Sequence, residues 1–141
     1  MYHTGKNNKI VGFTNGCYDI LHVGHLKLFK YLKSQCDKVI VGIDSDARVK
    51  ELKGPSRPFN NELDRKFMLE PLRYVDNVYV FNSGQELEQM VQLIKPDLMV
   101  VGADYRNKKV VGSEYAKKIE FFEKIDGYST TKILQHSFNR R

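Results

Sequence analysis

Short apolar runs alternate with amphipathic stretches along this chain. Apolar runs rich in β-branched residues predict strands, and apolar residues recurring every three or four positions predict helices. The predicted strands cover residues 9–14, 38–43, 77–81, 97–102 and 118–125. The predicted helices cover residues 23–34, 62–74, 85–94 and, capped by Ser129, about 129–137. Residues 44–46 can start a further helix, but the glycine and prolines in 50–61 predict mainly a loop there. Residues 103–116 are also predicted to be a loop. This alternation predicts one α/β domain over residues 1–141, with a mainly parallel sheet covered by helices on both faces.

Composition places the chain among globular proteins. Of its 141 residues, 41% are hydrophobic and 28% charged, and no apolar run is long enough to cross a bilayer. The N-terminal residues are polar and carry no export signal, so we expect a cytoplasmic protein without a membrane partner. Its two cysteines, Cys17 and Cys36, lack metal-ligand spacing and are expected to be reduced thiols.

The net charge of +6 permits an anionic ligand without naming one. Positive residues are spread along the chain, and a solvated surface accounts for most of them. No recognition-helix motif and no basic stripe with exposed aromatic residues is present, so nucleic acid is not an expected partner.

The first turn between strand and helix is the expected ligand site. Parallel α/β sheets bind ligands outside the carboxyl ends of their strands, where the strand order reverses. Gly16 and Cys17 follow the first strand and can expose backbone N–H groups there. The helix that begins near Val23 points its positive end at the same place. An anionic group fits this turn.

Two histidines stand at the start of that helix. His22 and His25 are three residues apart and can face one bound group, while Gly24 between them leaves room for a phosphate. Imidazole N–H groups can stabilise the charge that develops on a phosphorus centre in a transition state. The pair therefore favours phosphoryl or nucleotidyl transfer. The alternative for either histidine is a local role, satisfying backbone groups at the helix end.

Two motifs carry a resemblance to a known family. The segment HVGH at 22–25 matches the HxGH signature of the nucleotidyltransferase superfamily that includes the cytidylyltransferases, and GYSTTKI at 127–133 resembles its STT segment. The resemblance covers about residues 9–134, which would form the core of the domain. It implies a Rossmann-like fold and direct in-line attack of an acceptor phosphate on the α-phosphate of a nucleoside triphosphate, releasing pyrophosphate.

The resemblance also implies roles for the motif residues. The two histidines would hold the triphosphate and stabilise the transition state, the N–H groups of Cys17 and Tyr18 would contact phosphate, and Asp19 would support the turn. Ser129, Thr130 and Thr131 would bind the β- and γ-phosphates. Mg²⁺ would bridge the phosphates rather than be held by a protein site.

Two further segments resemble the heptose 1-phosphate adenylyltransferases, which make ADP-heptose. These are VKELKGPSRPFN at 49–60 and VGADYRNKKVVGSE at 101–114. The likeness implies ATP as co-substrate and a sugar phosphate as acceptor. By this resemblance, Lys53 and Lys50 would contact the substrate phosphates, and Lys53 would also take part in catalysis. Arg57 lines the loop, and Asp104 lies near the nucleotide or sugar. A solvated loop is the alternative for these charges.

Other readings remain open. Glycerol-3-phosphate cytidylyltransferase, which would use CTP, is the nearest rival, but it has an arginine where this chain has Lys124 and lacks the LKGxxRPxN loop. Asp44 stands where the heptose enzymes commonly have asparagine, so the acceptor pocket can differ. Arg65 and Arg73 suit structural ion pairs and do not distinguish between these two enzymes. A non-catalytic nucleotide or nucleic-acid binding module is a further alternative. Family members are often dimers, which leaves a homodimer open.

Overall fold

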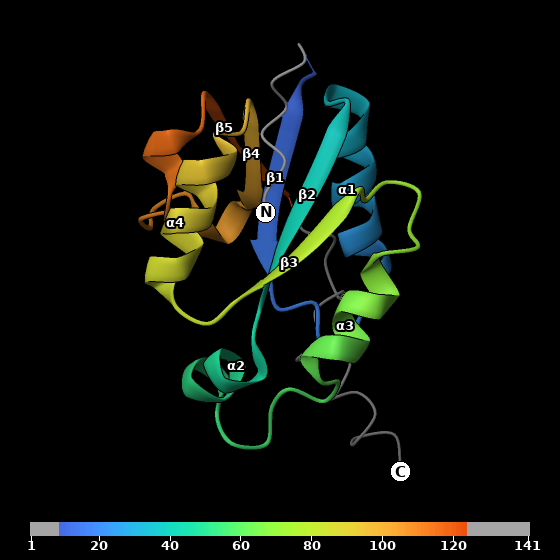
Figure 1. Ribbon diagram of the computed structural model, residues 1–141, viewed down its shortest axis with the longest axis vertical. Helices are drawn as coiled ribbons and strands as arrows, with labels where there is room; N and C mark the ends of the chain where they lie inside the picture. The colour runs from blue at the N-terminus through green and yellow to red at the C-terminus, as the bar shows by residue number, and fades with distance from the viewer. Residues whose placement is uncertain (1–8, 124–141) are drawn as a thin grey trace.

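A five-stranded sheet forms the centre of the molecule. The computed structural model describes residues 9–123, with the exception of the side chain of Asp104. The strands are β1 (Val11–Gly16), β2 (Lys38–Asp44), β3 (Asn77–Phe81), β4 (Leu98–Gly102) and β5 (Lys118–Phe122). They are hydrogen-bonded in the order β3-β2-β1-β4-β5, and every pair is parallel (Figure 1). The predicted parallel α/β sheet is confirmed.

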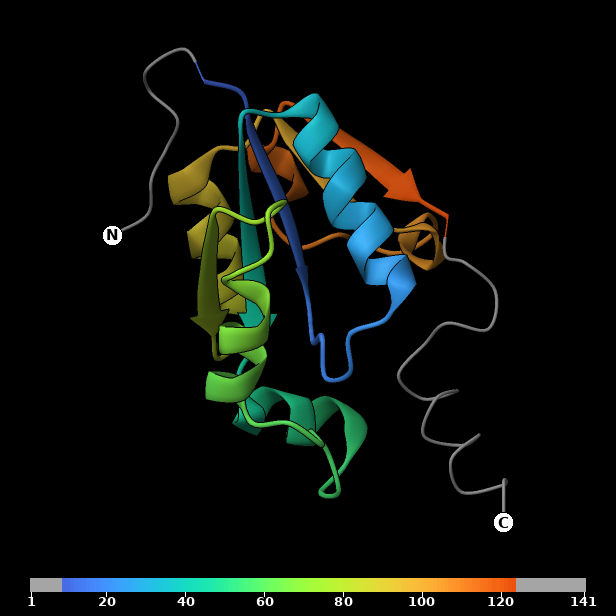
Figure 2. The same cartoon turned by 90° about the vertical axis from the view of Figure 1, so that its right-hand side faces the viewer.

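Helices cover both faces of this sheet. They are α1 (Val23–Gln35), α2 (Asp46–Lys53), α3 (Glu62–Leu69) and α4 (Gly84–Ile94), with two 3-10 turns, η1 (Ala103–Tyr105) and η2 (Ser113–Tyr115). Figures 1 and 2 show α1 and α3 on one face and α4 on the other, while α2 lies beyond the carboxyl end of β2. The expected Rossmann-like layering is therefore present.

Alternating strand residues build one hydrophobic core on each face. Val39 and Val41 point to the α1 side and pack with Phe29 and Leu32 of that helix, whereas Ile40 belongs to the core under α4. All five are fully buried. Because successive side chains of a strand point to opposite faces, this division follows from the apolar runs in the sequence.

The strand order reverses beside β1. The chain moves from β1 outward to β2 and β3, then returns to β4 on the other side of β1. Gly16 at the end of β1 pairs with Ile43 near the end of β2, so both strands finish at the same edge. The edge at which such a sheet is expected to bind a ligand therefore lies where the β1–α1 turn begins.

Two predicted helix boundaries are wrong. Residues 50–53 belong to α2 rather than to a loop, and the helix ends only at Gly54, whose φ of 104° suits glycine. The third helix stops at Leu69 instead of residue 74 because Pro71 cannot continue it. The predicted final helix from Ser129 lies outside the described residues.

Candidate active site

Tyr18 anchors the turn between β1 and α1. Its backbone has φ 52°, a left-handed conformation that a bulky residue adopts only where its surroundings enforce it. The ring is buried and meets the ring of His25 edge to face, with centroids 5.0 Å apart. A Cβ at Gly16 would come within 3.1 Å of the Tyr18 ring, so glycine leaves the space that this ring occupies. The tyrosine thus fixes both the turn and one side of His25.

The histidines close the first turn of α1. His22 is the N-cap, and its Nδ1 accepts a hydrogen bond from the N–H of Gly24 at 3.1 Å. The Nδ1 of His25 accepts in return from the N–H of His22 at 3.3 Å. The two rings are stacked, with centroids 3.7 Å apart and planes 23° from parallel. The capping box that usually pairs a serine with a glutamate is made here by two imidazoles.

This arrangement fixes the tautomer of each ring. A neutral imidazole carries one proton, and a nitrogen that accepts a hydrogen bond cannot hold it. Because Nδ1 of both His22 and His25 accepts from a backbone N–H, the proton of each neutral ring is on Nε2. The local role and the ligand role therefore use different atoms: Nδ1 caps the helix, and Nε2–H is a donor.

Asp19 ties the turn to the loop that follows α2. Its side chain is fully buried, and its carboxylate accepts the N–H groups of Phe59 at 2.8 Å and Asn60 at 2.7 Å. Nε of Arg57 forms an ion pair with the same carboxylate at 3.1 Å. The Asn60 side chain donates to the Asp19 carbonyl at 2.6 Å, so the loop and the turn hold one another in place.

These bonds set the charge state of Asp19. Burial by itself would raise the pKa of this carboxyl group, because it disfavours the charged form. The hydrogen bonds from Asn60 and Phe59 and the charge of Arg57 outweigh it, and the pKa lies below its ordinary value. Asp19 is therefore an ionised anchor of the turn rather than a proton donor.

A fully buried arginine joins the strand ends below the turn. Arg65 of α3 has no exposed side-chain surface. Its guanidinium donates to the carbonyl oxygens of Cys17, Asp44 and Asn60 and to the carboxylate of Asp46, at 2.7 to 2.9 Å. One side chain thus links the carboxyl ends of β1 and β2 with the start of α2 and with the loop.

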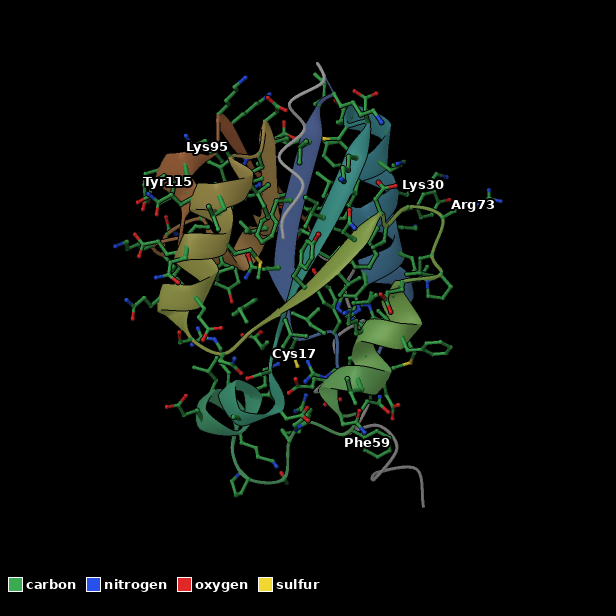
Figure 3. All side chains as sticks on the ribbon, in the orientation of Figure 1. Cys17, Lys30, Phe59, Arg73, Lys95 and Tyr115 are labelled. Carbon is green, nitrogen blue, oxygen red and sulfur yellow. The ribbon has the colours of Figure 1, made fainter. Side chains whose placement is uncertain are left out.

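Lys53 brings positive charge to the carboxyl edge of the sheet. It is exposed on the last turn of α2, and its charge acts on both Cys17 and Asp44. Burial raises the pKa of the Cys17 thiol, and the charge of Lys53 opposes that rise. Burial also raises the pKa of Asp44, whose carboxylate pairs with Arg48 at 2.9 Å. Figure 3 shows Cys17 at this edge, between the sheet and α2.

Comparison with known proteins identifies the family. The family described as Cytidylyltransferase-like matches residues 13–136, which contain the turn, both histidines and the STT segment. The chain belongs to this cytidylyltransferase-like family. It is 45% identical over 130 residues to the "Bifunctional protein HldE" of Nitratiruptor sp., and 47% identical over 129 residues to that of Helicobacter pylori. Each alignment covers 92% of this chain and 28% of the relative, so the chain spans less than a third of these proteins.

Solved structures show the same fold. A lipopolysaccharide core biosynthesis protein from Thermoplasma volcanium has a TM-score of 0.68 at 24% identity, covering 84% of this chain and all of that one. A pantoate-beta-alanine ligase from Francisella tularensis has a TM-score of 0.61 at 18% identity, covering 83% of this chain and 60% of that one. At these identities the likeness concerns the sheet and its helices. The predicted superfamily is confirmed by the family match.

The cytidylyltransferase-like site is partly contained in the described residues. The structure brings together Gly16, Cys17, Tyr18, Asp19, His22, Gly24 and His25 in one turn, with Arg57 bound to it and the charge of Lys53 close by. Lys50 is exposed on the preceding turn of α2. The side chain of Asp104 and residues Ser129, Thr130 and Thr131 lie outside what the structure describes. The substrate contacts of all these residues stay predictions.

Arg65 forms the structural ion pair expected of it, with Asp46, but its bonds to the carbonyl oxygens at the strand ends and the role of Asn60 were not predicted. Arg65 is four residues before the buried Leu69, so it falls in the core phase of α3. A charged residue in that phase signals buried partners, although it cannot say which ones. Asn60 gave no such signal, because its role depends on the fold bringing Asp19 to it from 41 residues away.

The described residues hold neither a metal cluster nor a membrane helix. Within 9–123, no three side chains of the His, Cys, Asp or Glu type are grouped to hold a metal ion. In the same range, every helix is too short or too polar to cross a bilayer.

Proposed function

We propose that this chain transfers the adenylyl group of ATP to heptose 1-phosphate, giving ADP-heptose and pyrophosphate. The observation that carries the proposal is the histidine-capped turn of α1, in which two Nε2–H donors stand beside a helix N-terminus. The family match, the 45% identity to bifunctional HldE proteins and the LKGxxRPxN and VGADY segments support this choice of nucleotide and acceptor.

The reaction is a single displacement at the α-phosphorus of ATP. An oxygen of the acceptor phosphate forms a bond to that phosphorus while the bond to the leaving pyrophosphate breaks, so no covalent enzyme intermediate is needed. Nε2–H of His22 and of His25 donates to phosphate oxygens, and these bonds strengthen as negative charge builds up in the transition state. The N–H groups of Cys17 and Tyr18 and the dipole of α1 add to the same stabilisation.

Cationic side chains around the turn neutralise the phosphates. Lys53, with Lys50 one turn before it on α2, contacts the charged groups of the bound substrates. Arg57 lines the acceptor side of the loop. Its Nη2 is buried and has no hydrogen-bond partner in the part of the chain described, which leaves a donor whose burial costs about 1–3 kcal/mol.

Mg²⁺ would enter with the phosphates of ATP, since the buried carboxylate of the turn, Asp19, is already engaged by the loop. Bound there, it would supply charge neutralisation to the phosphates. Ser129, Thr130 and Thr131 contact the β- and γ-phosphates, and Asp104 lies near the nucleotide or the sugar. The protein acts in the cytoplasm on a small phosphorylated sugar.

The test is pyrophosphate release by the purified chain with Mg²⁺, pairing ATP or CTP with heptose 1-phosphate or glycerol 3-phosphate. We expect turnover with ATP and heptose 1-phosphate alone. Turnover with CTP and glycerol 3-phosphate would instead assign the cytidylyltransferase alternative. Binding of nucleotide without turnover in any pairing would refute catalysis and favour a binding module.

A further inference from the structure

An acidic side chain lies at the carboxyl end of β2, beside the turn proposed to hold phosphates. Asp44 is the last residue of that strand, and its side chain is 13% exposed. Alternate residues of a strand share a face, so Asp44 is on the side of Ile40, which belongs to the core under α4. The charges of Lys53 and Arg65 act on its carboxyl group. Because a carboxylate repels a phosphate, Asp44 is not one of the groups that hold the phosphates themselves.

Arg48 engages one oxygen of Asp44 and leaves the other open. Nε of Arg48, on the first turn of α2, donates to Oδ1 of Asp44 at 2.9 Å. The guanidinium lies 5.7 Å from the centroid of the Phe81 ring on the neighbouring strand, a second contact that fixes its place. Oδ2 of Asp44 receives no hydrogen bond from the described residues, and it is not sealed from solvent. A ligand can therefore reach this oxygen.

The open oxygen selects a hydrogen-bond donor. An arginine side chain has donors and no acceptor, so its bond to Oδ1 keeps the carboxylate of Asp44 an acceptor on both oxygens. Phosphate groups present acceptor oxygens, whereas the hydroxyl groups of a sugar can donate. The part of a sugar phosphate that fits Oδ2 is therefore its polyhydroxylated chain or ring.

Helix α2 carries groups for both parts of such a molecule. It lies beyond the carboxyl end of β2, with Asp44 and Arg48 at its start and the exposed Lys50 and Lys53 on its later turns (Figure 1). The lysines suit the phosphate, and the carboxylate suits the hydroxyl groups. A phosphate alone would need no carboxylate here, so the two kinds of group together favour an acceptor that has both parts.

We infer that Asp44 determines acceptor specificity by binding a sugar hydroxyl group through Oδ2, with Arg48 as the positioning residue that holds the carboxylate. The inference deepens the proposed function and rests on it for the substrate class, a phosphorylated sugar. Loss of this contact weakens the binding of the acceptor and spares that of ATP. A purely structural ion pair between Asp44 and Arg48 would affect both ligands alike or neither.

Calorimetric titration of Asp44→Asn tests the contact without requiring turnover. Because Arg48 can only donate, the amide oxygen of the asparagine should face Arg48 and its NH2 group should face the ligand. We expect the dissociation constant for heptose 1-phosphate to rise by about 10–100-fold. The dissociation constant for ATP with Mg²⁺ should stay the same or fall, since a negative charge has been removed. The matched control, Glu51→Gln, removes an exposed charge from the same helix and should leave the affinity for the sugar phosphate unchanged.

Two further comparisons identify the hydroxyl group and the role of Arg48. Among deoxy analogues of the sugar phosphate, one should bind the wild type weakly but bind Asp44→Asn as well as the parent sugar phosphate does, because the contact it lacks is already gone. Arg48→Met should share the loss of sugar phosphate affinity, and Arg48→Lys should restore most of it. Circular dichroism checks that each variant is folded.

The result for Asp44 is separable from the result for the proposed function. Turnover with glycerol 3-phosphate instead of heptose 1-phosphate would refute the proposed function, and the same titrations with that acceptor, which also carries hydroxyl groups, would still test Asp44. Equal affinity of the wild type and Asp44→Asn for the accepted phosphate, a matching loss of ATP affinity, or equal losses from every deoxy analogue in both proteins would overturn the inference. A wild type that binds no phosphorylated sugar or polyol would overturn both.

Discussion

At the scale of the residue, the site depends on imidazoles that use their two nitrogens differently. Nδ1 of His22 and of His25 closes the helix turn, and this leaves the proton on Nε2. The histidines were identifiable from sequence because they are neighbours on one helix turn. Their tautomers were not, because these follow from backbone N–H groups whose positions only the folded turn defines.

Asp19 gives the first prediction at this scale. We expect Asp19→Asn to lower the free energy of unfolding by about 2–4 kcal/mol near pH 7, because it leaves the mostly buried guanidinium of Arg57 without its ion pair. The folded pKa is depressed, so this stabilisation is fully present above the ordinary carboxyl value of 3.8 and is lost as pH falls through the folded pKa. Urea unfolding at a series of pH values measures it.

The control for Asp19→Asn is Asp64→Asn, which changes an exposed carboxylate on α3. It should alter stability by less than about 0.5 kcal/mol at any pH. A difference between the wild type and Asp19→Asn that stayed constant or grew on acidification would contradict the assigned charge state.

At the scale of the element, the site is assembled by links between segments distant in sequence. The strands and most helices could be predicted because their periodicity is local. The network around Arg65 could not, since its bond to Cys17 spans 48 residues. The early end of α3 was not predicted, because the apolar periodicity continues past Leu69. Pro71 ends the helix there, since it has no N–H group for the helical hydrogen bond.

The network predicts a large effect of Arg65→Met. The substitution keeps an apolar stem of similar length but leaves the carbonyl oxygens of Cys17, Asp44 and Asn60 without their donor, so we expect about 3–5 kcal/mol lower stability. The rate of pyrophosphate release should also fall at temperatures where the variant is folded. Arg73→Met, at an exposed position, serves as the control. Equal stability of the two variants would show that Arg65 does not hold the strand ends.

At the scale of the whole molecule, the topology explains why the site is where it is. The reversal of strand order beside β1 opens the carboxyl edge, and α1 begins there with its positive end toward the opening. The class of fold and the location of this edge could be read from the order of elements. For residues 129–131 the motif alone supplies an expectation, and their contacts stay predictions because that segment lies outside the described residues.

Cys17 provides a probe of this edge. Its half-buried thiol should react slowly with iodoacetamide, and faster as pH rises, because burial raises its pKa above the ordinary 9.0. ATP with Mg²⁺ should slow the reaction about tenfold or more if the nucleotide covers the turn. Mass spectrometry of the modified peptide measures the rate, with buried Cys36 as the internal reference. Labelling of Cys17 that saturating nucleotide leaves unchanged would place the nucleotide elsewhere.

The turnover number of two His25 variants tests most directly whether Nδ1 caps the helix while Nε2 acts on the phosphate. The amide group of asparagine lies near the position of Nδ1 of the histidine it replaces. The amide group of the longer glutamine lies near the position of Nε2. His25→Asn should keep the cap and the stability of the fold but lower kcat by about 100-fold or more. His25→Gln should lose stability and keep more of kcat. If His25→Asn turned over at nearly the wild-type rate while His25→Gln did not, Nε2 would not be the catalytic atom.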